Sequence, residues 1–402
     1  MKKTTLFLCC AFVLLSGCGN KNNQSNNVNN LEEFSESDCD DPDKIYFLDF
    51  EHNLKNITDD KLAINSFAKD IKFIPLETTE EALLYNDRVQ IANINDGFLV
   101  SSSSIFTAYH SIMMFDSTGR FINYLMQRGQ GPKELPYIGE WSYNHKTQLL
   151  FASTSFQIII HSFENNISNK YTLEEYFSNA CLLNDGTIVG LPGHIGNGDV
   201  NTPYIHFLNQ EGVIISSLYY PQKRNIAYDI PEGRILGPSE SYGLYSSNTG
   251  EALFKDMFND TIYRIRSMND VKPYIIIHRG SLTLTLKDIN NPTGTQKIRL
   301  WNILDTKKYF IIKYEYKGKT YSSIWDKQTQ SLVTIFDFTK QSFSRAGDNY
   351  ATYRTPTGKV ITINISGYFD GKLYGILDAA DAMEFLPGIV EDDNPVLMII
   401  TM

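Results

Sequence analysis

Short apolar or alternating runs recur along the chain from about residue 70 onward, and glycine, asparagine, aspartate and proline separate them. Runs of roughly four to eight such residues, bounded by turn-forming residues, are typical of β-strands. Asn-Asp-Gly occurs at 95–97 and again at 184–186, each time between two strand-like runs, and this turn sequence favours a β-hairpin. The pattern therefore predicts an all-β body with few helices.

One strand pattern recurs, an apolar run followed by a polar turn and a further strand. Its copies lie near Ser111, Phe156, Tyr204, Asp260, Thr320 and Lys372. The interval is about 50 residues, which suits a propeller blade of about four antiparallel strands. Six such units fill the chain from about Asn86 to Met402 and predict a six-bladed β-propeller. Because the spacing is irregular, a non-repeating β-sandwich or a pair of sandwiches is the alternative.

A propeller must also close its ring, and the pattern offers a strand for this purpose. The run from Lys72 to Glu77 precedes the first unit and is strand-like. We expect it to pair into the last blade, beside the run from Val396 to Thr401. Pro75 is compatible with an edge strand or a bulge.

The first residues have the pattern of an export signal. Two lysines precede an unbroken apolar run of ten residues, from Leu6 to Leu15, which is too short to span a bilayer and suits a signal peptide. The sequence Leu-Ser-Gly-Cys at 15–18 resembles the bacterial lipobox. This resemblance implies cleavage before Cys18 and lipidation of its thiol.

We therefore divide the chain into a signal peptide (1–17), a lipidated N-terminus with a flexible tether (18–65), and the propeller (66–402). The stretch from Asn20 to Asn30 is polar and of low complexity, so it cannot bury enough apolar surface to fold. The predicted location is the cell envelope, as an outer-membrane lipoprotein held to the membrane by its N-terminal lipid. The sequence does not decide between the periplasmic and the outward face.

Composition supports a large body and argues against nucleic acid as a partner. Apolar residues make up 42% of the chain, and tyrosine and phenylalanine number 24 each; both aromatics favour strands. The net charge of −10 becomes −12 when Lys2 and Lys3 leave with the signal. No basic cluster is present, so we expect no nucleic acid partner.

Several motifs, taken in order, resemble a family. They are Ile74–Thr79 (IPLETT), Arg128–Pro132 (RGQGP), Phe258–Ile265 (FNDTIYRI), Gly367–Gly375 (GYFDGKLYG) and Asp393–Met398 (DNPVLM). The ordered set resembles the six-bladed β-propeller lipoproteins of Bacteroidetes, a largely uncharacterised family. The resemblance implies this fold and export, and it implies no established activity. One departure is that Gly131-Pro132 continues as Lys-Glu-Leu, where the family often has Gly-Glu-Tyr.

Propellers usually bind their ligands at the central channel or on the face formed by connecting loops. Arg128 and Gln130 lie between the first two predicted units, beside two glycines that permit tight turns. Their side chains offer donors to a carboxylate or a sugar hydroxyl. The alternative is a turn between blades in which Arg128 packs against an acidic residue.

A second glycine-rich loop, at 193–199, contains His194, Asn197 and Asp199. Together these side chains are candidates for contact with a ligand or a cation. The alternative is a simple long connection, and the loop lacks the ligand spacing of a calcium-binding loop.

No catalytic or metal-binding signature is present. The seven histidines form no HxH or HExxH pair, and GxSxG does not occur. We therefore expect no metal, no other cofactor and no catalytic residue that can be named. His161 and His206 lie in predicted strands, where a packed or a blade-surface histidine is the default. Cys181 is expected to be a small buried residue, and its pairing with Cys39 is left open.

These observations favour a lipid-anchored, non-catalytic binding module for a peptide, a glycan or a partner protein of the cell envelope. The alternative is a polysaccharide-active hydrolase or lyase with acidic residues at the propeller channel. An enzyme of this kind needs two or three convergent charged side chains in one pocket, and carboxylate pairs of this kind come from distant parts of a chain.

Overall fold

The structure is a computed structural model that describes residues 43–54, 63–84, 88–103, 111–192, 201–220, 243–247, 249–256, 258–285, 288, 296–338 and 349–402. Residues Cys39–Met402 form one compact unit, and a second unit, Met1–Asp38, lies outside the described residues. The expected signal peptide and Cys18 therefore lie outside the described part of the chain.

The described strands form six sheets, which we call blades 1 to 6 in chain order. Blade 1 contains β3 (Arg88–Ile94), β4 (Gly97–Ser103), β5 (Ser111–Asp116), β6 (Phe121–Arg128) and β7 (Glu134–Leu135). Blade 2 contains β8 (Glu140–Asn144), β9 (Leu149–Ser153), β10 (Gln157–Ser162) and β11 (Ile167–Thr172). Blade 3 contains β12 (Phe177–Leu182), β13 (Ile188–Pro192), β14 (Pro203–Leu208) and β15 (Ile214–Tyr219).

The other three blades follow the same plan, with one added strand each in blades 4 and 6. Blade 4 contains β16 (Gly243–Ser246), β17 (Ala252–Lys255), β18 (Thr261–Ser267), β19 (Asp270–His278) and β1 (Tyr46–Asp49). Blade 5 contains β20 (Arg299–Asp305), β21 (Tyr309–Tyr316), β22 (Lys319–Asp326) and β23 (Ser331–Asp337). Blade 6 contains β24 (Asn349–Arg354), β25 (Val360–Phe369), β26 (Lys372–Leu377), β27 (Val396–Thr401) and β2 (Asp70–Pro75). The described helices are α1 (Phe50–Leu54) and α2 (Ala379–Ala382), with 3-10 turns η2 (Ile64–Ser66) and η3 (Gly280–Leu282).

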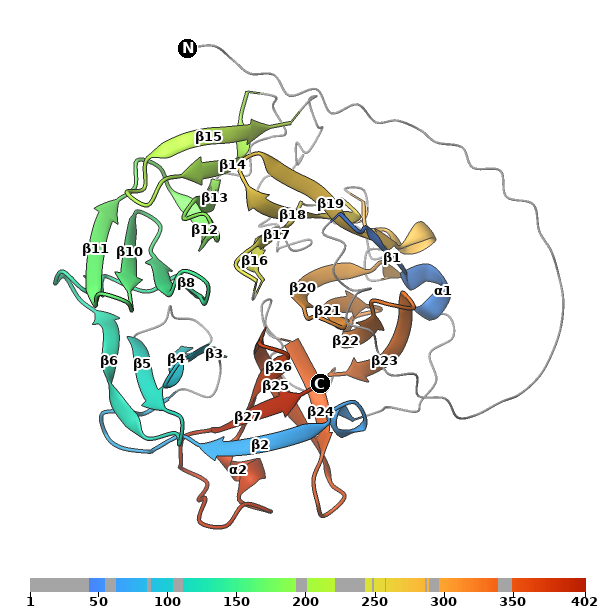
Figure 1. Ribbon diagram of the computed structural model, residues 1–402. Coiled ribbons are helices and arrows are strands. Elements are labelled where there is room, and N and C mark those ends of the chain that lie inside the picture. The colour runs from blue at the N-terminus through green and yellow to red at the C-terminus, as the bar shows by residue number, and fades with distance from the viewer. Residues whose placement is uncertain are drawn as a thin grey trace, which may run out of the picture. The chain divides into compact units, whose positions relative to one another are not determined.

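Figure 1 shows the six blades around a common axis, so the fold is the predicted six-bladed β-propeller. Buried apolar side chains gather into six clusters, and each cluster joins two neighbouring blades. The cluster of blades 6 and 1, for example, includes Phe98, Phe115 and Leu397. Because every blade packs on both neighbours, the hydrophobic core is itself a closed ring.

The repeat read from the sequence matches the blades, with one shift. Five of the six recurring patterns coincide with β5, β10, β14, β18 and β22, each the third strand from the axis. The sixth, at Lys372, coincides with β26. In blade 6 the innermost strand is β25, which contacts β3 and β20 as the innermost strands of other blades contact each other. Counted from β25, β26 is the second strand from the axis. It is nevertheless the third strand of blade 6 when the strands are counted along the chain from β24, because β24 precedes β25.

The ring closes as expected. β2 pairs antiparallel with β27 along its whole length, from Asp70 opposite Thr401 to Pro75 opposite Val396. β2 is the outermost strand of blade 6, so Pro75 lies at the edge of the sheet, where a missing N–H is tolerated. A strand from the start of the body thus completes the sheet made by its end.

Two of the family-like motifs meet at this closure. Asn394 is buried, and its side-chain amide donates hydrogen bonds to the backbone carbonyls of Glu77 and Ala82. Its side-chain oxygen accepts the N–H of Leu84 at 2.9 Å, and its own N–H donates to Oγ1 of Thr78 at 2.8 Å. One asparagine therefore fastens the segment that follows β2 to the segment that precedes β27.

The motif at Phe258–Ile265 also has a structural role. Asp260 accepts a hydrogen bond at 2.6 Å from Nε of Arg279, a fully buried side chain. Arg279 also donates to the backbone carbonyl of Ile298 at 2.8 Å. Since a buried guanidinium needs paired acceptors, Asp260 fixes the chain between blades 4 and 5.

The segment 18–65, expected to be a tether, contains folded structure near its end. β1 pairs parallel with β19, from Tyr46 opposite Ile275 to Asp49 opposite His278. α1 follows directly and buries Phe50 and Leu54. The folded body therefore begins about twenty residues before the predicted boundary, and we call residues 43–54 the strap.

Aromatic packing holds the strap at the junction of blades 4 and 5. The Tyr46 ring packs edge-on against Tyr274 and Phe310, with centroids 5.4 and 5.0 Å away. The Phe50 ring stacks on Trp325 at 4.7 Å and is fully buried. These contacts belong to the same buried cluster that joins the two blades, so the strap is part of the propeller core.

Candidate functional site

The loop at Arg128–Pro132 connects blade 1 to blade 2 and is held in a defined shape. The N–H of Gly129 donates to the carbonyl of Leu135, and the N–H of Gly131 donates to Oε2 of Glu134, both at 2.8 Å. Lys170 of β11 donates to the Glu134 carbonyl at 2.8 Å. A Cβ at position 129 would lie 2.0 Å from Oε2 of Glu134, so a larger residue there would displace the carboxylate that accepts the Gly131 N–H.

This bracing leaves the two predicted binding residues on the surface. Arg128 ends β6, and the side chains of Arg128 and Gln130 are both exposed. The loop is thus a turn between blades, and Glu134, which the family-like sequence retains, fixes its backbone. Arg128 and Gln130 lie in the same connection between β6 and β8 as Tyr137, a residue that the sequence analysis did not single out.

Tyr137 belongs to a group of exposed aromatic side chains on blade 2. Tyr137 is 37% exposed, Phe156 56% and Tyr176 41%. The Phe156 and Tyr176 rings lie 5.7 Å apart at 51° to each other. We call Tyr137, Phe156 and Tyr176 the aromatic surface; they come from the connection before β8, the loop between β9 and β10, and the connection before β12.

Hydrogen bonds hold these three loops together. The Tyr137 hydroxyl donates to Oγ of Ser155 at 2.7 Å and accepts the Ser155 N–H at 3.0 Å. The N–H of Phe177 donates to the carbonyl of Ser155, and that of Leu173 donates to the carbonyl of Phe156. Oγ1 of Thr154 accepts the N–H of Phe156 at 3.1 Å. Phe156 is therefore presented to solvent on a fixed turn.

Exposed charged and polar side chains lie in the connections that carry the aromatic surface. Arg128 and Gln130 lie in the connection that carries Tyr137, and the exposed Glu174 and Glu175 directly precede Tyr176. An apolar centre with a polar rim is the usual composition of a protein recognition surface. Sequence reasoning missed the aromatic surface because its members are about 20 residues apart; the only signal was an aromatic residue in each of three polar loops.

Both strand histidines are buried rather than on the blade surface, and each pairs with a serine of the next strand. Nδ1 of His161 lies 2.8 Å from Oγ of Ser168, and Nδ1 of His206 lies 2.8 Å from Oγ of Ser217. Burial lowers the pKa of both imidazoles, and for His206 the carboxylate of Glu175 partly offsets this effect. The same cross-strand pair in two successive blades indicates a role in blade packing.

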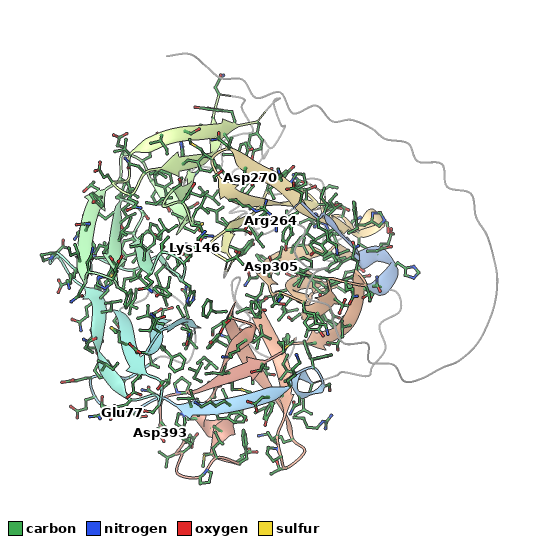
Figure 2. The ribbon with its side chains drawn as sticks, viewed as in Figure 1. Glu77, Lys146, Arg264, Asp270, Asp305 and Asp393 are labelled. Atoms are coloured by element: carbon green, nitrogen blue, oxygen red, sulfur yellow. The ribbon has the colours of Figure 1, made fainter. Side chains whose placement is uncertain are left out.

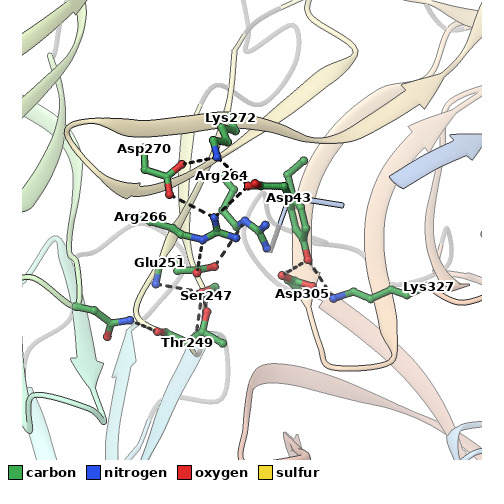
Figure 3. Close-up of polar contacts among 12 residues, drawn as sticks. Asp43, Ser247, Thr249, Glu251, Arg264, Arg266, Asp270, Lys272, Asp305 and Lys327 are labelled. Atoms are coloured by element: carbon green, nitrogen blue, oxygen red, sulfur yellow. Dashed lines mark hydrogen bonds and ion pairs between the residues drawn. The ribbon is translucent and has the colours of Figure 1, made fainter. Parts of the chain in front are cut away.

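The densest group of charges in Figure 3 is paired internally. Arg266 contacts Glu251 at 3.0 Å and Asp270 at 3.3 Å, and Lys272 contacts Asp43 of the strap at 2.8 Å. Beside them, the buried Lys327 forms an ion pair with Asp305. Because these side chains satisfy one another, this network stabilises the junction of blade 4 with the strap.

The remaining predicted site residues lie outside the described part of the chain: Cys18, His194, Asn197 and Asp199. Among the described residues, no group of three or more histidine, cysteine, aspartate or glutamate side chains is arranged to hold a metal ion. Cys181 is buried, and burial raises the pKa of its thiol to about 12. Cys39, its candidate pairing partner, lies outside the described residues.

No helix in the described ranges has the length and apolar character that crossing a membrane requires.

Six sheets around one axis, with apolar clusters between neighbours and an aromatic surface on connecting loops, define a six-bladed β-propeller with a loop-borne candidate binding surface. The chain belongs to the family described as "Domain of unknown function (DUF4934)", whose match covers residues 45–401. This match begins in the strap, in agreement with the folded boundary seen in the structure.

Solved structures with this fold include a "Putative exported protein" from Bacteroides fragilis NCTC 9343. It is 16% identical, with 89% of this chain and 99% of that chain covered and a TM-score of 0.63. A member of the DUF4221 family from Bacteroides vulgatus is 12% identical over 83% of this chain and 96% of that chain, with a TM-score of 0.46. Virginiamycin B lyase from Staphylococcus aureus is 12% identical over 83% of this chain and 99% of that chain, with a TM-score of 0.39. At these identities the likeness concerns the fold alone, and among curated proteins none matches the chain.

Proposed function

We propose that this protein is a non-catalytic binding module that recognises a protein partner of the cell envelope through the aromatic surface. The observation that carries the proposal is the rigid presentation of Phe156, which is 56% exposed on a hydrogen-bonded turn. Exposed aromatic side chains grouped on one face are a feature of interaction sites, and tyrosine and arginine dominate binding hot spots.

The chemistry of the centre favours protein over glycan. Phe156 is the most exposed member of the aromatic surface and has no hydrogen-bonding group, so only apolar atoms complement it well. Tyr137 and Tyr176 add hydroxyl groups beside it, and Arg128 and Gln130 add donors in the connection that carries Tyr137, which suit a peptide backbone or polar rim. Because the three loops are already fixed, binding requires little ordering of this surface.

The proposal is tested by placing a photo-crosslinking side chain at position 156 in cells that make the protein. We expect one adduct that a crosslinker at Ile215 does not give, since Ile215 is a similarly exposed apolar residue, 49%, on β15. With that partner purified, Phe156→Ala is expected to weaken binding about 30-fold or more, as for a hot spot of about 2 kcal/mol. Ile215→Ala is expected to leave the affinity unchanged.

Two outcomes would overturn the proposal. One is glycan binding that Phe156→Ala abolishes, which would assign the aromatic surface to sugars. The other is turnover of a polysaccharide that a single acidic substitution abolishes, which would make the protein an enzyme.

The same proposal includes export and a lipid anchor at Cys18. It is supported by the basic start, the ten-residue apolar run and the lipobox-like sequence at 15–18, and it agrees with the name of the exported B. fragilis protein. Several acyl chains anchor a protein stably, since each buried methylene contributes about 0.8 kcal/mol. The anchored protein then resides at the outer membrane, on its periplasmic or its outward face.

The anchor predicts a change of fraction. Cys18→Ala is expected to move the protein from the membrane to the soluble fraction on ultracentrifugation and immunoblotting. Cys39→Ala, which changes a cysteine beyond the lipobox, is expected to leave it in the membrane fraction. Membrane retention of the Cys18 variant equal to that of the unaltered protein would contradict the anchor.

A further inference from the structure

A pocket of about 360 Å³ lies where the ring closes. Its wall comes from residues 75–78 at the end of β2 and just after it, 118–120 in the turn between β5 and β6, and 388–389 with 393–394 before β27. Figure 2 shows Glu77 and Asp393 close together at this outer edge of the ring. The volume is at the lower end of the range for small-ligand sites, about 300–1,000 Å³.

The pocket combines two carboxylates with one guanidinium and an apolar floor. Glu77, Asp393 and Arg120 supply the charges, and Leu76 and Ile389 supply apolar contact. Leu76 is 2% exposed, so it forms part of the packed wall. The charged lining carries a net charge of −1, which favours a ligand that is cationic where it meets the carboxylates.

Backbone hydrogen bonds fix both carboxylates in place. Oε2 of Glu77 accepts the N–H of Phe121 at 2.8 Å, and Oδ2 of Asp393 accepts the N–H of Val390 at 2.9 Å. The N–H of Glu77 donates to the carbonyl of Gly119 at 2.8 Å. Within the described residues, the second oxygen of each carboxylate has no donor at bonding distance, so it is available to a ligand.

An ammonium group suits this arrangement, because it has three donors and no acceptor. Arg120 then suits a carbonyl or carboxylate oxygen of the same ligand, and Ile389 suits a small side chain. We propose that the pocket binds the free amino end of a peptide, with the α-ammonium at Glu77 and Asp393 and a following carbonyl at Arg120. The site is separate from the aromatic surface and does not depend on the function proposed for that surface.

The test is an NMR titration of the full mature chain with trialanine and with N-acetyl-trialanine. We expect chemical shift changes around Gly119 and Ile389 with the free peptide and none with the acetylated one. Glu77→Gln and Asp393→Asn keep an oxygen for the backbone N–H groups and remove the charge. Each is expected to weaken trialanine binding about three- to fivefold, as for a solvent-exposed ion pair.

Asp392→Asn is the matched control, because Asp392 is the exposed neighbour and does not line the pocket. Its affinity for trialanine is expected to equal that of the unaltered protein. Equal binding of the acetylated peptide would overturn the proposal even if a variant failed to fold. Binding of glucosamine in place of trialanine would assign the pocket to an amino sugar.

Discussion

Phe50→Ala is expected to lower the free energy of unfolding by about 3–5 kcal/mol, as for a large aromatic side chain removed from a packed core. Phe50 is fully buried, stacks on Trp325 at 4.7 Å and meets Tyr314 edge-on at 5.2 Å. The cavity would open where the strap meets blade 5. Urea unfolding followed by tryptophan fluorescence measures the change and also reports on Trp325.

Phe47→Ala is the matched control for this prediction. Phe47 lies three residues earlier in the strap and is 58% exposed, so its removal is expected to change the free energy of unfolding by no more than about 0.5 kcal/mol. If the free energy of unfolding of both variants equals that of the unaltered protein, the strap contributes nothing to the stability of the folded body. The folded boundary would then return to about residue 66, as the sequence alone had indicated.

Lys327→Ala is expected to cost about 3–5 kcal/mol of stability, because it leaves a carboxylate without its cation in a buried place. The Lys327 and Asp305 side chains are only 7% and 13% exposed. The Tyr274 hydroxyl donates to Asp305 at 3.0 Å, and the ammonium of Lys327 lies 4.5 Å from the centre of the Phe310 ring. Removal of the lysine therefore also breaks a cation–π contact with Phe310, which packs against Tyr46 of the strap.

Another lysine–aspartate pair of blade 5 provides the comparison. Lys319 and Asp337 lie 3.5 Å apart, and the lysine side chain is 51% exposed. Lys319→Ala is expected to cost about 0–1 kcal/mol, since water screens this pair. Similar losses in the two lysine variants would contradict the view that burial decides the contribution of each pair.

The architecture could be predicted because a propeller repeats its pattern. Strands of alternating or apolar character, separated by turn residues at intervals of about 50 residues, defined the blades. The pairing of β2 with β27 followed from the need to close the ring and was confirmed. The shift at Lys372 arose because β26 and the true third strand, β27, are both short apolar runs, and periodicity does not distinguish them.

The strap and the candidate sites could not be predicted in the same way. β1 is four residues long, with alternate burial of Tyr46 and Leu48, and so short an alternation gives almost no periodic signal beside a polar, low-complexity stretch. The aromatic surface and the pocket where the ring closes each consist of residues from three loops, so only folding brings these residues together. Arg128 and Gln130 could be identified as candidate binding residues because two glycines indicate a turn there. Phe156 and Glu77 have no neighbouring glycine that would indicate a site.

The order of β1 and β2 along the chain has a mechanical consequence. β1 holds on to blade 4 and precedes β2, which completes blade 6. Tension applied through the residues before Asp43 therefore reaches β1 and Tyr46 first, where β1 lies along the edge of β19. The strap would separate from blades 4 and 5 before any force reached β2. The pairing of β2 with β27, which closes the ring, would then remain intact while the strap unfolded.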